Sequence, residues 1–156
     1  MVKTNAEEGV RIAKEFTEEL LKKMGFEAKV KTAEEDSALH IKIEGDDLGL
    51  LIGYHGENLE AIQLILALMI NNNLDTKDWI PVNLDVGGWR NERSESLKIM
   101  IDKAAAEIEA KKELVELPPM SASQRRMVHV LLSDYPNITS ESIGEEPNRK
   151  VVIKKA

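Results

Sequence analysis

Two glycines three residues apart constrain the first half of this chain more than any other feature. Gly53 and Gly56 stand between an apolar stretch, Leu48–Ile52, and a predicted helix over Glu57–Asn71. Because glycine has no Cβ, the pair allows a tight turn between two helices and the close approach of another backbone. The turn also leaves free amides at the positive end of the second helix, where a phosphate can bind. For two glycines alone, a plain helix–helix turn is the commoner explanation.

The elements before this turn follow from apolar periodicity. Residues Glu7–Met24 predict an amphipathic helix that Gly25 ends. Its apolar face is expected to consist of Val10, Ala13, Phe16, Leu20 and Met24. Glu27–Thr32 and Ala38–Ile43 alternate in character and predict two strands joined by a polar loop.

The elements around and after the turn complete the pattern. Asp46 or Asp47 is expected to cap the short helix over Leu48–Ile52. The helix after the turn is expected to end at the run Asn71-Asn72-Asn73, with Leu59, Ile62, Ile65, Leu66 and Met69 facing inward. Ile80–Val86 predicts a third strand, so the order of elements is α-β-β-α-α-β.

The second half predicts a smaller α+β unit. A long charged helix over Arg90–Lys112 comes first. Pro118-Pro119 then interrupts regular structure before the next helix. Its apolar side consists of Leu97, Ile101, Ala104 and Ile108. A helix over Ser121–Asp134 precedes two short strands, Thr139–Ile143 and Lys150–Ile153. We therefore expect an α+β chain of two domains, residues 1–88 and 89–156, with the long helix in the second.

Charge and composition restrict the function classes. The chain has a net charge of −7, which argues against a strongly basic nucleic-acid surface. The charge is uneven, because the segment from Leu114 onward carries a net +1 and the remainder a net −8. The absence of cysteine excludes disulfides, thiolate metal sites and a cysteine nucleophile. No signal-like segment begins the sequence and its longest apolar run, Leu64–Ile70, is too short to span a bilayer, so we expect a cytoplasmic protein with no membrane insertion.

The helix over Ser121–Asp134 carries the most specific motif. Ser121 and Gln124 have the spacing of a capping box, which fixes the start of the helix. At 3.6 residues per turn, Arg125, Arg126, His129 and Ser133 share one face. The opposite face carries Met127, Val128, Leu131 and Leu132. Two guanidiniums, an imidazole and a hydroxyl on one face can bind phosphates. A basic helix face that only contacts solvent would show the same residue pattern.

The glycine turn in its context resembles a known nucleic-acid-binding loop. The pattern Ile-Gly-x-x-Gly-x-x-Leu-x-x-Ile over residues 52–62, after two strands and before a third, is similar to the KH domain in its type II arrangement. The resemblance implies a three-stranded sheet with helices on one face, and a loop of Gly53, Tyr54, His55 and Gly56 that clamps about four nucleotides of single-stranded backbone. The middle residues of such loops are often basic, so Tyr54 and His55 imply weaker binding.

The second motif also resembles a known domain. Leu117-Pro118-Pro119-Met120 followed by Arg-x-x-x-His, and later by Glu145–Ile153, closely resembles the R-three-H domain, which binds single-stranded nucleic acid. The resemblance implies binding by Arg125, Arg126 and His129, with Arg149 and Lys150 adding positive charge from the last strand.

The succession of both domains resembles the bacterial Jag family, also called KhpB or EloR. That resemblance implies a cytoplasmic protein that binds single-stranded RNA, with single-stranded DNA as a further ligand, and regulates transcripts after transcription. It also implies a link to cell elongation and envelope synthesis and a smaller partner with only a KH domain. Many family members carry an additional N-terminal Jag domain and a linker, whereas this sequence begins almost at the predicted KH helix, as a short family member or a part of a longer protein would.

Two other classes of function compete with this interpretation. An enzyme such as a nuclease would depend on His129 with Asp134, or on Asp46 with Asp47, and the sequence contains no P-loop, H-E-x-x-H or G-x-S-x-G motif. We therefore expect no catalytic residues, no cofactor and no metal. A protein-interaction scaffold, built on the acidic first half and the long helix, is compatible with RNA binding.

Overall fold

A computed structural model describes residues 2–110 and 112–156, with side chains from Glu7 onward. The chain divides into two compact units, of which the first ends at Arg90 and the second begins at Asn91. Each unit has its own apolar core.

The first unit has the expected order of elements. It contains α1 (Val2–Met24), β1 (Lys29–Glu35), β2 (Ala38–Glu44), α2 (Gly49–Ile52), a short 3-10 turn η1 (Tyr54–Gly56), α3 (Glu57–Asn73) and β3 (Val82–Val86). The strands form one sheet in the order β1-β2-β3, in which β1 and β2 are antiparallel and β2 and β3 are parallel. The predicted α-β-β-α-α-β order and three-stranded sheet are confirmed.

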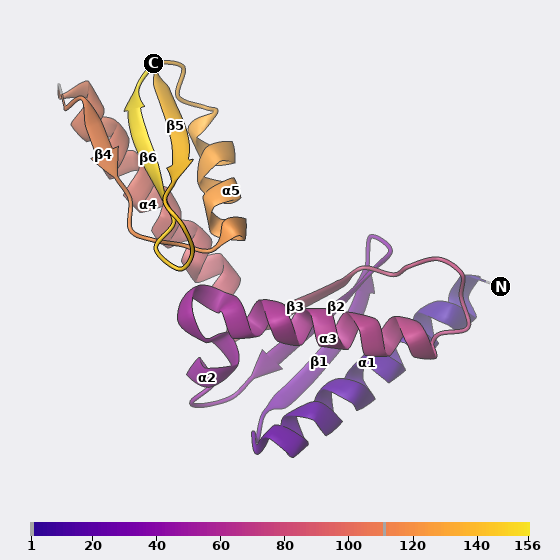
Figure 1. Cartoon of the computed structure of the whole chain (residues 1–156). Coiled ribbons are helices and arrows are strands. Elements are labelled where there is room, and N and C mark those ends of the chain that lie inside the picture. Colours follow the sequence, from indigo (N-terminus) through magenta and orange to yellow (C-terminus); the bar gives the residue numbers. More distant parts are fainter. Residues whose placement is uncertain (1, 111) are drawn as a thin grey trace. The chain divides into compact units, whose positions relative to one another are not determined.

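Strand alternation places the helices on one face of this sheet. Leu39, Ile41 and Ile43 of β2 are buried, and Val82, Leu84 and Val86 of β3 share their face. The alternate residues Lys42 and Asn83 are exposed. Helices α1 and α3 pack against each other and against the sheet (Figure 1). The apolar side chains of the strands are therefore covered on the helix side, while the polar side remains open.

Three sequence predictions for this unit were wrong in detail. Neither Asp46 nor Asp47 caps α2, because its N-cap is Leu48 and no side chain bonds there. The most buried residues of α1 are Gly9, Ile12, Ala13, Thr17 and Leu21. Of the predicted residues, Ala13 is among them, Val10, Phe16 and Leu20 are partly buried against the same core, and Met24 is exposed. Of the residues expected to face inward on α3, Ile65 is exposed and Ala67 and Ile70 are buried in addition.

Helix α3 ends at Asn73, within the predicted run of asparagines and two residues beyond the predicted bound of Asn71. Asn71 ties the helix to the segment before β3. Its Nδ2 donates to the carbonyls of Ala67 and Ile80, and its Oδ1 accepts from the Ile80 amide at 2.8 Å. The asparagine side chain therefore satisfies both backbone hydrogen-bonding groups of Ile80. Strand β3 begins at Val82, two residues later than predicted.

The second unit is a sheet packed against two helices. It contains α4 (Trp89–Glu109) from Asn91 onward, β4 (Leu114–Glu116), α5 (Ala122–Leu132), β5 (Ile138–Ile143) and β6 (Lys150–Lys155). The strands have the order β4-β6-β5, and both pairs are antiparallel. The four predicted apolar residues of α4 are all buried, in one core with Val128 and Leu132 of α5 and Val151 and Ile153 of β6. Sequence reasoning missed β4.

Candidate nucleic-acid interface

The glycine turn adopts backbone angles that require glycine at both positions. Gly53 has φ 70° and Gly56 has φ 88°, both in the left-handed region. A Cβ on Gly53 would lie 2.5 Å from Cγ of Asn58, and one on Gly56 would lie 2.3 Å from the ring of Trp89. The two glycines are therefore needed for conformation and for close packing, and Trp89 fills the space beside the turn.

A side chain further fixes this turn. Nδ2 of Asn58 donates to the carbonyl of Leu50 at 2.8 Å, which joins the first turn of α3 to α2. The N-cap residue of α3 is Gly56, which has no side chain to cap the helix. Glu57 and Glu60 in the same turn place negative charge nearby, which weakens the attraction for a phosphate.

Tyr54 and His55 form the tip of the turn. The Tyr54 ring is 63% exposed, and its centroid lies 4.0 Å from that of the tilted His55 ring. His55 itself is half-buried and has a positive φ of 51°. An exposed aromatic ring held by a neighbour offers a surface on which a base can stack.

The second predicted site is a pocket lined by one face of α5 and by Ser142 of β5. Ser121 caps the helix, because its Oγ accepts from the Gln124 amide, as the first half of the capping box requires. The pocket has a volume of about 530 Å³ and is lined by Ala122, Arg125, Arg126, His129, Val130, Ser133 and Ser142. The prediction that Arg125, Arg126, His129 and Ser133 share one face is confirmed. The opposite face differs from the prediction, because Met127 is exposed.

The cations of this pocket are not equivalent. The side chain of Arg125 is only 8% exposed, its Nη1 donates to the Met120 carbonyl at 2.7 Å and its Nη2 lies 2.8 Å from a carboxylate oxygen of Glu146. Arg126 is exposed, with no ion pair to any described residue. Nδ1 of His129 shares a 2.7 Å hydrogen bond with Oγ of Ser140. Arg125 is thus a partly neutralised structural cation, whereas Arg126 is free to meet a ligand.

The other two predicted residues lie outside the lining of this pocket. Arg149 is exposed, and its carbonyl accepts from the Met120 amide. Lys150 pairs with the carboxylate of Glu116 on the neighbouring strand β4. The structure therefore brings together Arg125, Arg126 and His129.

Sequence reasoning missed several residues that shape the two sites. Trp89 packs on the glycine turn, and Glu146 holds Arg125. Ser140 and Ser142 stand two apart on β5, a spacing that places them on one face of a strand and was visible in the sequence. Arg93 of α4 donates from Nη2 to Oε1 of Gln124, and burial lowers the pKa of its guanidinium.

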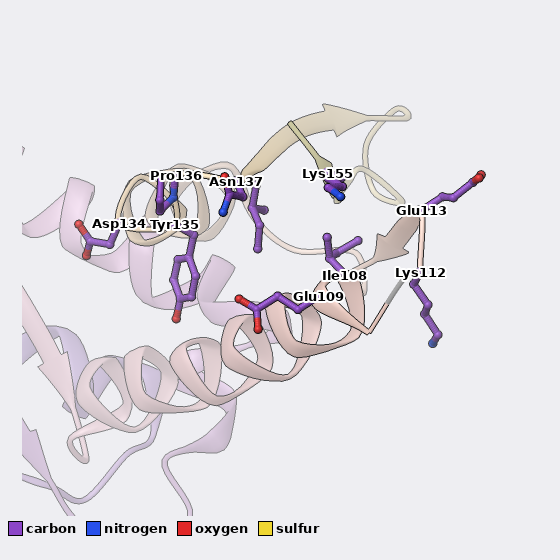
Figure 2. Close-up of a pocket in the computed structure, with 10 residues that line it drawn as sticks. Ile108, Glu109, Lys112, Glu113, Asp134, Tyr135, Pro136, Asn137 and Lys155 are labelled. Carbon is purple, nitrogen blue, oxygen red and sulfur yellow. The ribbon is translucent and has the colours of Figure 1, made fainter.

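A second cavity of about 530 Å³ lies between the last turn of α4 and the segment that leads into β5 (Figure 2). Ile108, Tyr135 and Ile138 supply apolar surface, and Glu109 points toward the space beside Tyr135. The Tyr135 hydroxyl donates to Oδ1 of Asp102 at 2.5 Å. This hydrogen bond, with burial and nearby carboxylates, raises the pKa of Tyr135.

Two features are absent from the described residues. No group of three or more His, Asp or Glu side chains stands close enough to hold a metal ion. Within the same ranges, no helix combines the length and the apolar character needed to cross a bilayer.

Comparison with known proteins identifies both units. Residues 11–80 match the KH domain of KhpA/KhpB, and residues 95–155 match the R-three-H domain. RNA-binding protein KhpB of Clostridium symbiosum is 32% identical over 141 residues, which cover 89% of this chain and 63% of that protein. The protein of the same name from Streptococcus pneumoniae is 28% identical over 138 residues, 88% of this chain and 42% of the relative. That of Bacillus subtilis is 29% identical over 146 residues, 92% of this chain and 69% of the relative.

The fold and its motifs therefore define a protein with a KH domain followed by an R-three-H domain. The chain belongs to the Jag/KhpB family, as the sequence motifs predicted. It spans 63% and 42% of the length of the first two of these relatives.

Proposed function

We propose that this chain binds single-stranded RNA through the glycine turn of the KH domain and through the α5 pocket of the R-three-H domain. The observation that carries the proposal is the gathering of Arg125, Arg126 and His129 around one pocket. Guanidinium and imidazole groups on one surface suit phosphate oxygens. The relatives' printed name, RNA-binding protein, supports RNA as the nucleic acid, and single-stranded DNA is a further ligand of the same chemistry.

The two sites contribute different interactions. At Gly53, Tyr54, His55 and Gly56, binding depends on backbone amides and on stacking against Tyr54, since no Lys or Arg stands in the turn. At the second site, Arg126 supplies the accessible charge, and Arg149 and Lys150 add positive charge nearby in the chain. We assign the first site to a domain of residues 1–88 and the second to residues 89–156.

The biological role proposed here follows the family. The chain acts in the cytoplasm as a regulator of transcripts, linked to cell elongation and envelope synthesis, and performs no catalysis. A smaller partner with only a KH domain binds it. Leu64, Ile65 and Leu68 support such a partner, because these three side chains form an exposed apolar stripe on α3.

The test is a binding titration of the full chain with a labelled single-stranded RNA of mixed sequence. The double variant Tyr54→Asp and His55→Asp adds two negative charges at the turn, and Arg126→Glu reverses one charge in the pocket. Lys22→Glu is the control, because it makes the same change in charge at an exposed position of α1. Both site variants should bind more weakly than the control. Equal affinity of all four proteins would contradict the proposal.

A further inference from the structure

Two serines of β5 occupy positions that normally belong to a core. Ser140 and Ser142 alternate with the exposed residues Thr139 and Glu141, so they share the less exposed face of the strand. In the antiparallel pair with β6, Ser140 stands opposite Ile153 and Ser142 opposite Val151. Both partners are fully buried. Because directly opposite residues lie on the same face of a sheet, the two hydroxyls lie on the side that α5 covers.

The structure accounts for one of these hydroxyls. Ser140 Oγ shares its hydrogen bond with Nδ1 of His129, which leaves Nε2 as the ring nitrogen that a ligand can bind. Ser142 Oγ is buried and has no hydrogen-bond partner among the described residues. A buried hydroxyl without a partner destabilises a fold. A ligand that accepts a hydrogen bond from this hydroxyl removes that cost, which adds to the binding free energy.

The surroundings of Ser142 indicate the chemistry of that ligand. Ser142 lines the same pocket as Arg125, Arg126 and His129, all groups that donate hydrogen bonds to anions. The other serine of the pocket, Ser133, already donates to the carbonyl of Val130 at 2.6 Å. The pocket thus combines cations with one unused hydroxyl donor, which is the donor set of a phosphate site.

We propose that Ser142 donates a hydrogen bond to a phosphate oxygen of the bound strand and is a further binding residue of the R-three-H pocket. This inference rests on the proposed function. Arg126 and His129 hold the same phosphate from the α5 side, while Ser142 holds it from β5. A phosphodiester group therefore binds between a helix and a strand of one domain. A base or a ribose alone would not pair with all of these donors.

The experiment compares Ser142→Ala with Thr139→Ala, which removes a hydroxyl from the exposed face of the same strand, in the full chain. Affinities are measured by fluorescence anisotropy with a single-stranded RNA and with DNA of the same sequence, and thermal unfolding is recorded without ligand. Ser142→Ala should weaken binding to both strands about tenfold, the effect of losing a hydrogen bond to a charged group. Its melting temperature should be unchanged or higher, because the lost hydroxyl has no partner in the free protein. Thr139→Ala should bind as the unaltered protein does, because Thr139 does not line the pocket.

Other results separate the inference from the proposed function. Unchanged affinity of Ser142→Ala, with clear binding by the unaltered protein, would overturn the inference alone. A loss confined to RNA would assign the hydroxyl to a ribose and overturn the phosphate assignment. An equal loss in both variants would show a general effect of changes on β5 and would likewise overturn it. Failure of the unaltered protein to bind either strand would overturn the proposed function itself.

Discussion

Oε1 of Glu146 lies 2.8 Å from Nη2 of Arg125, so the guanidinium expected to hold phosphate already holds a carboxylate. Arg125 is buried, whereas the Glu146 side chain is 60% exposed. A phosphate that approaches Arg125 must compete with this carboxylate for the same donor. Glu146 therefore lowers the affinity of the pocket for anions.

Glu146→Gln should strengthen binding of single-stranded RNA by about fivefold, which corresponds to roughly 1 kcal/mol. The amide oxygen still accepts from Arg125, but the competing negative charge is gone. The measurement is a titration with RNA at fixed salt. Glu145→Gln is the matched control, because it removes the same charge from the adjacent exposed residue. Equal gains in the two variants would assign the effect to net charge alone.

Arg126 and Arg125 should respond differently to truncation. Arg126→Ala should weaken binding and reduce the slope of log affinity against log salt by about 0.7, the value for one lost phosphate contact on a single strand. Its thermal unfolding should not change, since the side chain is exposed. Arg125→Ala should in addition lower stability by about 1–3 kcal/mol, because the Met120 carbonyl loses its donor. An unchanged melting curve of Arg125→Ala would contradict its structural role.

Two glycine substitutions separate the cost of a steric clash from the cost of an unfavourable backbone conformation. Gly56→Ala places a Cβ against Trp89 at a positive φ, whereas Gly25→Ala meets a positive φ with no atom within 4 Å. Gly25→Ala should therefore cost about 1 kcal/mol of unfolding free energy, and Gly56→Ala about 3 kcal/mol. Urea unfolding followed by tryptophan fluorescence measures both, because Trp79 and Trp89 both belong to the first unit. Equal costs would show that the Trp89 contact adds nothing.

Much of the fold was predictable because its signals are local. Alternation over residues 38–43 and the apolar side of the long helix required no knowledge of distant residues, and both were confirmed. The buried side of α1 was harder to predict. Its centre includes Gly9, which packs on Leu39, and Thr17, whose hydroxyl bonds to the Ala13 carbonyl at 2.6 Å. Neither residue counts as apolar in a periodicity pattern, so the predicted face was centred on Val10, Phe16 and Leu20, which are only partly buried against the core.

The candidate site was predictable as a motif and not as a set of contacts. Helical spacing placed Arg125, Arg126 and His129 on one face, as the structure has them. Spacing does not reveal that Glu146, in the turn between β5 and β6, pairs with Arg125, or that Ser140 bonds to His129. These contacts depend on how β5 and the turn after it pack against α5, which is tertiary information. For the same reason β4 escaped prediction, since its three residues pair with β6 across a long stretch of chain.

Tyr135 allows the environment of the second cavity to be tested by titration. The chain has two tyrosines, so in a Tyr54→Phe background the phenolate absorbance reports Tyr135 alone. The hydrogen bond to Asp102 raises the pKa of Tyr135 above its usual value of about 10. Asp102→Ala should move the midpoint back toward that value, because it removes both the acceptor and its charge. Asp134→Asn is the control and should shift the midpoint less, since Asp134 acts only through its charge.

The same shift fixes the direction of a stability change. A pKa that is higher in the folded than in the unfolded state contributes stability that is fully present below the unfolded value and is lost as the pH rises through the folded value. The melting temperature of the Tyr54→Phe protein should therefore fall as the pH rises above about 10. Removal of Asp102 should make the melting temperature less dependent on pH in this range. An ionisation midpoint of Tyr135 that is identical with and without Asp102 would contradict the hydrogen bond as its cause.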